Sequence, residues 1–115
     1  MDFPEIITRL PQAELPIPPS KVKTHVLPSD RGQIVFFHVL EDVEIPPHSH
    51  KAQWGTVLEG EVEVTIGGET RHYGRGDTYY IPAGVVHSAR FDARTRVIDF
   101  FAEPHRYKIK TKGEQ

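Results

Sequence analysis

Glycine and proline interrupt this chain at short intervals, and this spacing is the feature that most limits what it can fold into. The segments between them are short, and several alternate apolar with polar side chains. In Glu61–Ile66 the residues Val62, Val64 and Ile66 fall on one side of an extended strand. No segment repeats its apolar residues with the period of an amphipathic helix. The sequence therefore predicts an all-β protein, built as a sandwich or a barrel.

Residues that favour turns separate the expected strands. Gly67-Gly68 predicts a two-residue hairpin, because glycine adopts the positive φ that such a turn requires. Pro82-Ala83-Gly84 predicts a second turn. The strands that we expect are, in order, Lys23–Leu27, Gln33–Leu40, Val43–His50, Trp54–Leu58, Glu61–Ile66, Glu69–Tyr73, Thr78–Ile81, Val86–Phe91 and Arg96–Ala102.

The two ends of the chain differ from the part between them. Residues 1–20 contain five prolines, which favour an extended arm and not a helix. The arm also carries isoleucines and leucines, so we expect it to pack on the barrel or on a dimer partner. Residues 21–107 form one barrel domain, since 115 residues supply one core and not two. Residues 108–115 form a polar C-terminal tail that we expect to be frayed.

Composition excludes several classes of function. The chain has 14 basic and 16 acidic residues and a net charge of −2, so nucleic acid is not an expected partner. No run of about 18 apolar residues is present, so no membrane helix is expected. The first residues lack the pattern of a secretion signal, and we expect a cytoplasmic protein. Because the chain has no cysteine, any metal must be held by histidine, carboxylate, amide or water.

The two histidines of His48-Ser49-His50 are the residues that point most clearly to a binding or catalytic site. Pro46 and Pro47 exclude a helix before it, which favours an extended segment. Side chains two residues apart on a strand point to the same side, so the two imidazoles can bind one metal ion. Gln53 and His87 are the other potential ligands.

These residues and the glycines around them resemble the two sequence motifs of the cupin family. His48 and His50, followed by Gln53 and by Gly60 after six residues, are similar to the first motif. The second motif is matched in register by Gly76, Pro82, Gly84 and His87, and 15 residues separate the two motifs. The resemblance implies a cupin-type double-stranded β-helix, a jelly-roll barrel with the extended N-terminal arm attached. It also implies a metal inside the barrel, held by His48, His50, Gln53 and His87.

The chain departs from the cupin pattern at four points. Asp42 stands where the first motif begins with glycine, and Phe91 stands where the second ends with asparagine. Two residues separate His50 from Gln53, one fewer than usual, and Gln53 replaces the usual glutamate. A neutral amide leaves a divalent ion its full charge, which makes it a stronger Lewis acid and favours an anionic ligand. Alternatively, Gln53 does not touch the metal, which leaves a three-histidine site like that of the thiol dioxygenases, also cupins.

Other residues are candidates for the pocket and for catalysis. Phe36, His38, Trp54 and Phe91 are expected to line the pocket, although His38 also suits a barrel rim or a dimer contact, and Trp54 also suits packing. His38 and Asp99 are the candidate catalytic residues. Asp99 lies in an apolar strand and needs a polar partner if buried. The remaining histidines, His25, His72 and His105, are expected at the surface. The same is expected of Arg90, Arg94 and Arg96, which alternate on one strand face; alternatively, these arginines steer an anion towards the barrel mouth.

Two functions stay open from the sequence, and a purely structural metal ranks below both because an apolar barrel does not need one. The first is a metal-dependent enzyme, of the dioxygenase, isomerase, decarboxylase or lyase type that the resemblance implies, acting on a small carboxylate- or oxygen-rich molecule. The second is a non-catalytic cupin that binds or senses a small ligand. Both use one divalent transition metal per chain, namely Fe, Mn, Zn, Ni or Co, and a small-molecule ligand for which an anion is favoured. Because strand edges and an apolar arm need cover, we expect a homodimer.

Overall fold

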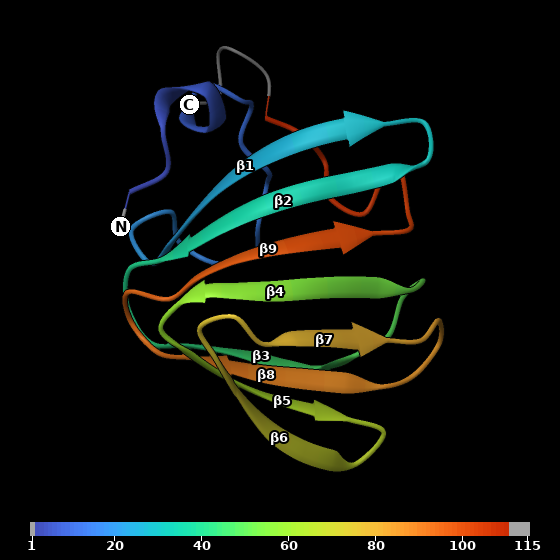
Figure 1. Cartoon of the computed structure of the whole chain (residues 1–115). Helices are drawn as coiled ribbons and strands as arrows, with labels where there is room; N and C mark the ends of the chain where they lie inside the picture. The colour runs from blue at the N-terminus through green and yellow to red at the C-terminus, as the bar shows by residue number, and fades with distance from the viewer. Residues whose placement is uncertain (1, 111–115) are drawn as a thin grey trace.

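The computed structural model describes residues 2–110 and consists of two antiparallel sheets that face each other (Figure 1). The larger sheet has the order β1-β2-β9-β4-β7 and the smaller has the order β3-β8-β5-β6. The strands are β1 Val22–Ser29, β2 Gly32–Val39, β3 Val43–His48, β4 Gln53–Glu59, β5 Glu61–Ile66, β6 Glu69–Gly74, β7 Thr78–Ile81, β8 His87–Phe91 and β9 Arg96–Phe101. The predicted all-β architecture is confirmed.

The core lies between the two sheets. Val62 and Val64 of β5 pack against Val57 of β4 and Val97 of β9, and all four are almost completely buried. Each such valine contributes about 1.5–3 kcal/mol through removal from water. The alternation in Glu61–Ile66 is therefore what fixes the inner face of the smaller sheet.

The Gly67-Gly68 hairpin is present as predicted. It joins β5 to β6 with Ile66 opposite Glu69. Gly67 and Gly68 have φ of 56° and 84°, the positive values that a two-residue turn of this type requires.

The N-terminal arm packs on the barrel of its own chain. Ala13 is 3% exposed and lies in an apolar cluster with Val26, Val35 and Phe101. The expectation of a wholly extended arm is wrong at Glu5–Thr8, which form the short helix α1 directly after Pro4. Proline suits the start of a helix, because its missing N–H is not needed there.

The C-terminal segment is ordered further than we expected. Ala13 and Ile109 form a β-bridge, and the Lys110 N–H donates to the Gln12 carbonyl at 2.8 Å. The expectation of a frayed tail is therefore wrong for residues 108–110. Residues 111–115 of that expected tail lie outside the described part of the chain.

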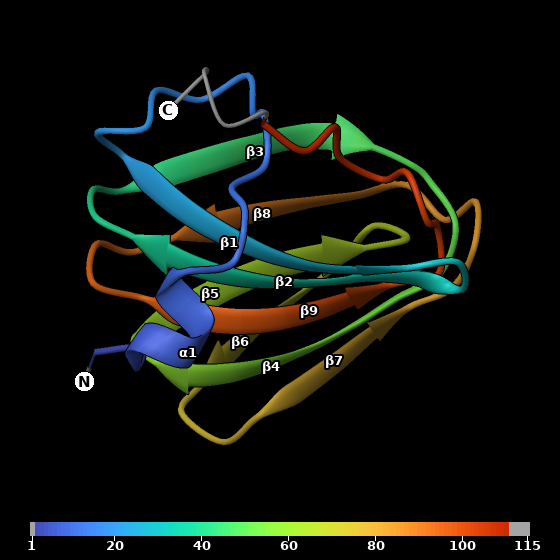
Figure 2. The same ribbon diagram turned by 90° about the horizontal axis from the view of Figure 1, so that it is seen from above.

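Two residues expected at the surface are buried, because the arm covers part of the outer face of the larger sheet (Figure 2). The His25 ring donates from Nδ1 to the Leu10 carbonyl at 3.1 Å. Arg96 forms ion pairs with Glu59 and with Asp2. The other expected surface residues are exposed: His72, His105, Arg90 and Arg94.

An apolar row crosses the part of that outer face that the arm leaves open. Its members stand opposite one another on the successive strands β1, β2, β9, β4 and β7, and are Leu27, Ile34, Phe100, Trp54 and Tyr80. Leu27, Phe100, Trp54 and Tyr80 are 46%, 41%, 43% and 59% exposed. We call these five residues the outer row. Among the described residues there is no helix with the length and apolar character that a membrane span needs.

Candidate metal centre

The structure brings together three of the four predicted ligands, His48, His50 and His87. Their ring centroids are 5.2 Å apart for His48 and His50, 4.3 Å for His48 and His87, and 4.7 Å for His50 and His87. One potential ligand atom from each ring lies within 4.8 Å of the other two. Three imidazoles at this spacing can share one metal ion.

The backbone places each histidine in a different way. His48 is the last residue of β3 and stands opposite His87, the first residue of β8. The pairing of β3 with β8 is irregular between Ile45 and His48, where the two prolines lie. β3 ends at His48, so the predicted strand to residue 50 is two residues too long. His50 lies in the following loop, and its carbonyl accepts from the Gly84 N–H at 2.9 Å.

Hydrogen bonds to backbone carbonyls fix the tautomer of all three rings. Nδ1 of His48 lies 2.8 Å from the Pro46 carbonyl, Nδ1 of His50 lies 2.6 Å from that of Lys51, and Nδ1 of His87 lies 3.0 Å from that of Val85. A carbonyl only accepts, so each Nδ1 must carry the proton. Each Nε2 then keeps its lone pair, the form in which imidazole binds a metal.

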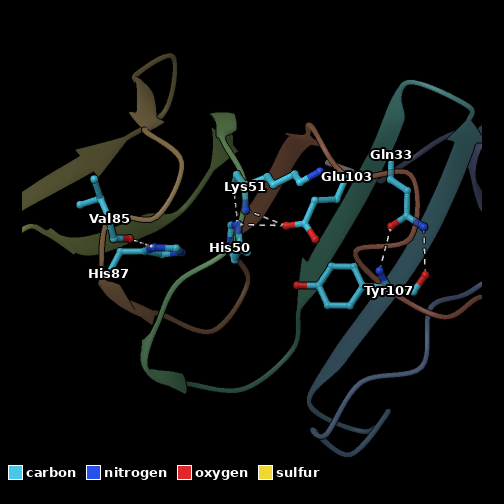
Figure 3. A network of polar contacts seen from close by, with 7 residues as sticks. All are labelled: Gln33, His50, Lys51, Val85, His87, Glu103 and Tyr107. Atoms are coloured by element: carbon cyan, nitrogen blue, oxygen red, sulfur yellow. Dashed lines mark hydrogen bonds and ion pairs between the residues drawn. The ribbon is translucent and has the colours of Figure 1, made fainter.

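The free ring nitrogens test whether this cluster fits a metal. Nε2 of His50 and Nε2 of His87 are buried and have no hydrogen-bond partner in the described part of the chain. Buried polar atoms without a partner are costly and rare, so a ligand is expected there. Figure 3 shows the His87 ring extending toward His50, while the Lys51 backbone beside His50 is held by Glu103. The cluster therefore fits a metal ion.

The electrostatic setting keeps two of these rings neutral. Burial lowers the pKa of His50 and of His87 below the usual histidine value, more than any other effect. The positive charge of Arg106 and the neighbouring histidines lower both pKa values further. Because a metal needs the neutral ring, these shifts favour metal binding near neutral pH.

The cluster borders a cavity of about 100 Å³ between the two sheets. This exceeds the roughly 10–15 Å³ that one water needs on the same measure. The arm and both sheets supply apolar wall, including Leu15, Ile17, Val39, Val43, Ile45 and Phe91. The polar wall consists of His48, His50, Gln53, Tyr79, His87, Asp99, Arg106 and Tyr107. The cavity therefore suits a small molecule with one polar and one apolar part.

Gln53 lines the same cavity and belongs to a buried polar network. Asp99 accepts a hydrogen bond from the Tyr79 hydroxyl at 2.7 Å and another from the Gln53 side chain. Burial raises the pKa of Asp99 to about 6, although these two hydrogen bonds oppose the change. Burial and the nearby Asp99 raise the pKa of Tyr79 well above its usual value. The partners that a buried Asp99 was expected to need are thus Tyr79 and Gln53.

Three residues expected to line the cavity lie on the outer face of the larger sheet instead: Phe36, His38 and Trp54. The Phe36 ring packs against Phe3, with centroids 5.7 Å apart. Side chains alternate between the two faces of β2, and both faces are rich in apolar residues. The sequence therefore did not show which face is the inner one, and the outer face was taken for it. His38 is therefore also misplaced as a catalytic candidate. Phe91, the fourth expected lining residue, does border the cavity.

Sequence reasoning missed Arg106 and Tyr107, which also border the cavity. The Arg106 guanidinium lies 4.4 Å from the Tyr107 ring centroid. Gln33 holds this segment, since its side-chain amide donates to the Tyr107 carbonyl at 2.9 Å and accepts from the Tyr107 N–H at 3.1 Å (Figure 3). The available signal was Gln33, a polar residue at the start of an otherwise apolar strand.

Comparison with known families agrees with this arrangement. Residues 35–101, more than half of the chain, match the family model described as a cupin domain. The chain belongs to the cupin family. In this cupin the three clustered histidines come from the two motifs, and Gln53 stands at the position of the motif glutamate. No curated protein matches the chain.

Solved structures of other cupins have the same fold. KdgF from Halomonas sp. superposes with a TM-score of 0.69 and 26% identity, covering 80% of this chain and 86% of that one. An RmlC-like cupin from Shewanella frigidimarina gives a TM-score of 0.72 and 24% identity, covering 86% and 87%. Oxalate decarboxylase from Bacillus subtilis, which contains Mn(II) centres, gives 0.69 and 19%, covering 86% of this cupin and 29% of that chain. The last two show similarity of fold alone.

Proposed function

We propose that this cupin is a metal-dependent enzyme that acts on a small carboxylate- or oxygen-rich molecule. The observation that carries the proposal is the cluster of His48, His50 and His87, whose hydrogen bonds leave three Nε2 lone pairs at one end of a cavity. The ion would be one of Fe, Mn, Zn, Ni or Co, because imidazole suits all of them. When bound, it would supply Lewis-acid chemistry to an oxygen atom of the substrate.

Gln53 is the proposed fourth ligand, through its amide oxygen. It is 9% exposed and lines the cavity together with the histidines. Because an amide and three neutral imidazoles carry no charge, the site would keep the full charge of the ion. Such a site favours a ligand that brings its own negative charge.

Arg106 supports an anionic substrate. Its Nε is buried without a hydrogen-bond partner among residues 2–110, and its charge acts on both His50 and His87. A carboxylate that entered the cavity could accept from this guanidinium, a charge-assisted bond of the strong kind. The apolar wall would enclose the rest of the molecule and exclude water. Arg106 is thus the group that we expect to orient the substrate.

The rival function, a cupin that binds or senses a ligand without turnover, has one observation in its favour. Of the two candidate catalytic residues, His38 faces away from the cavity and Asp99 already accepts hydrogen bonds from Tyr79 and Gln53. No separate general base is therefore apparent on the described cavity wall. Turnover would depend on polarisation of the bound substrate and not on a dedicated base.

The experiment that separates these functions combines binding with turnover. Protein loaded with each candidate metal is mixed with a panel of small carboxylates, including oxalate, and both thermal shift and product formation with oxygen uptake are measured. Product formation that requires metal supports the enzyme. A thermal shift without product supports the ligand-binding cupin.

A matched pair of arginine variants tests the proposed substrate class. The probe is the carboxylate from the panel that raises the melting temperature of wild type most. Arg106→Gln should weaken its binding at least tenfold, about 1.4 kcal/mol. Arg75→Gln, at an exposed position, should leave binding unchanged. Equal affinity in wild type and Arg106→Gln would remove the argument for an anion.

The outer row supports a homodimer. An antiparallel sheet usually turns polar residues to water, whereas this row presents Phe100, Trp54 and Tyr80. A two-fold dimer brings the same patch of both subunits together, so an apolar row would cover itself. A second copy of this chain is therefore the partner that we propose for this face.

A further inference from the structure

We propose that Asp99 is a positioning residue that sets the orientation of the Gln53 amide and so turns its oxygen toward the histidine cluster. This inference rests on the metal site of the proposed function, and it assigns the role of a residue that the histidines themselves do not explain. Asp99 acts through Gln53 and is not taken to touch the substrate.

The larger sheet places the members of this network side by side. On β7, β4 and β9 the residues Tyr79, Gly55 and Asp99 stand opposite one another in one inward-facing row. Gln53 lies two residues before Gly55 on β4 and therefore faces the same way. Tyr79 must cross the central strand to reach Asp99, and it does so at the position where that strand has no side chain.

Gly55 makes this crossing possible. A Cβ at position 55 would lie 2.1 Å from Asp99 Oδ1 and 2.4 Å from the Tyr79 ring. Both distances are too short for real contacts, so any other residue would push the carboxylate or the ring away. The absence of a side chain at Gly55 is thus part of the polar network.

The carboxylate determines which end of the Gln53 amide faces which way. Asp99 accepts a hydrogen bond from the Tyr79 hydroxyl at 2.7 Å and is also hydrogen-bonded to the Gln53 side chain. A carboxylate oxygen accepts, so the Gln53 NH₂ group is the end of the amide that donates to it. The amide oxygen is then the atom left for the cavity that the three histidines also border.

This arrangement gives a neutral residue the orientation that a metal ligand needs. Without an acceptor behind it, the amide could present either oxygen or NH₂ to the cavity, and NH₂ does not bind a cation. Outer partners of ligands typically change metal affinity by about 10–100-fold. We therefore expect Asp99 to affect the metal mainly through Gln53.

A double-mutant cycle with Co²⁺ tests this directly. Co²⁺ affinity and the visible absorption spectrum are measured for wild type, Asp99→Asn, Gln53→Ala and the double variant, with the exposed Asp30→Asn as control. Asp99→Asn should weaken Co²⁺ binding at least tenfold and change the spectrum. In the Gln53→Ala background the same substitution should change affinity less than about threefold, because the side chain through which it acts is gone.

The remaining outcomes count against one proposal or the other. An equal loss of Co²⁺ affinity in both backgrounds overturns the positioning role, since Asp99 would then act on the metal through its charge and not through Gln53. An unchanged affinity and spectrum in Asp99→Asn also overturns it, since Asp99 would then have no effect on the metal. Wild type that binds no Co²⁺ overturns the proposed function, and the positioning role with it. If Asp99→Asn does not fold, Gln53→Met replaces it. That variant must change the spectrum, and an unchanged spectrum contradicts the inference.

Discussion

The two faces of the larger sheet use neighbouring residues for opposite purposes. Three inward residues form a buried polar network at the cavity, and the residue directly after each of them is an exposed aromatic of the outer row. The pairs are Gln53 and Trp54, Tyr79 and Tyr80, and Asp99 and Phe100. Because side chains alternate along a strand, consecutive residues must lie on opposite faces of the sheet. Alternation does not determine that the three polar residues lie inside and the three aromatic residues outside. The inversion agrees with our two proposals, a metal site on the inner face and a dimer contact on the outer face.

The largest effect on stability should come from adding a side chain at Gly55, where Tyr79 crosses β4 to reach Asp99 on the inner face. Gly55→Val should lower the free energy of unfolding by about 3 kcal/mol, because its side chain would collide with Asp99 and Tyr79. Thr56→Val, the next residue and on the outer face, should cost less than about 1 kcal/mol. Chemical denaturation of both variants checks the difference, and equal losses would mean that the inner face is not the tighter one.

The buried carboxylate should make stability depend on pH. The pKa of Asp99 is raised to about 6, so the folded state favours its protonated form. That contribution is fully present below the unfolded pKa, near 3.9, and is lost as pH rises through about 6. Between pH 4 and pH 7.5, metal-free wild type should lose roughly 2–3 kcal/mol relative to Asp99→Asn. Parallel pH profiles of unfolding for the two proteins would be inconsistent with a buried Asp99.

The two adjacent tyrosines offer the cleanest test of the contrast between faces. Tyr79→Phe removes the hydroxyl that donates to Asp99 and should cost about 2 kcal/mol, because a buried carboxylate loses a donor. Tyr80→Phe changes an exposed ring and should stay within about 0.5 kcal/mol. Urea denaturation at neutral pH measures both. A reversed order would show that the hydroxyl on the outer face is the one that matters.

The smallest effect on unfolding should come from the outer row itself. Trp54→Gln should change the stability of the monomer by no more than about 0.5 kcal/mol, since the side chain is 43% exposed. It should nevertheless weaken self-association at least tenfold, because buried tryptophans dominate interfaces. Light scattering over a dilution series checks this. A wild type that stays monomeric at micromolar concentration would contradict the dimer.

Much of the fold could be predicted because it depends on local patterns. Gly67-Gly68 and the alternation of Val62 and Val64 determine a hairpin and its inner face without reference to the rest of the chain. The histidine cluster could also be predicted, because His48, His50 and His87 lie in motifs with fixed spacing. The strand through His50 was wrong, since the residues after the two prolines leave the sheet.

What could not be predicted depends on contacts between distant segments. Phe36 and His38 were placed on the wrong side because β2 is apolar on both faces, and only the position of the smaller sheet, against which Phe37 packs, shows which face is inner. Arg96 was expected in water, yet it is covered when the first residues of the chain fold over β9. Arg106 borders the cavity in a segment that Gln33, 74 residues away from Tyr107, helps to hold in place through hydrogen bonds to Tyr107.

Metal content measures the central claim most directly. Protein purified without added metal and then incubated with an equimolar mixture of Fe²⁺, Mn²⁺, Zn²⁺, Ni²⁺ and Co²⁺ is desalted and its metals are counted by mass spectrometry. We expect about one ion per chain in wild type and in the exposed control His72→Ala, and almost none in His87→Ala, since a site with two remaining imidazoles holds the ion weakly. Equal metal content in His87→Ala and wild type would contradict a metal site at the three histidines.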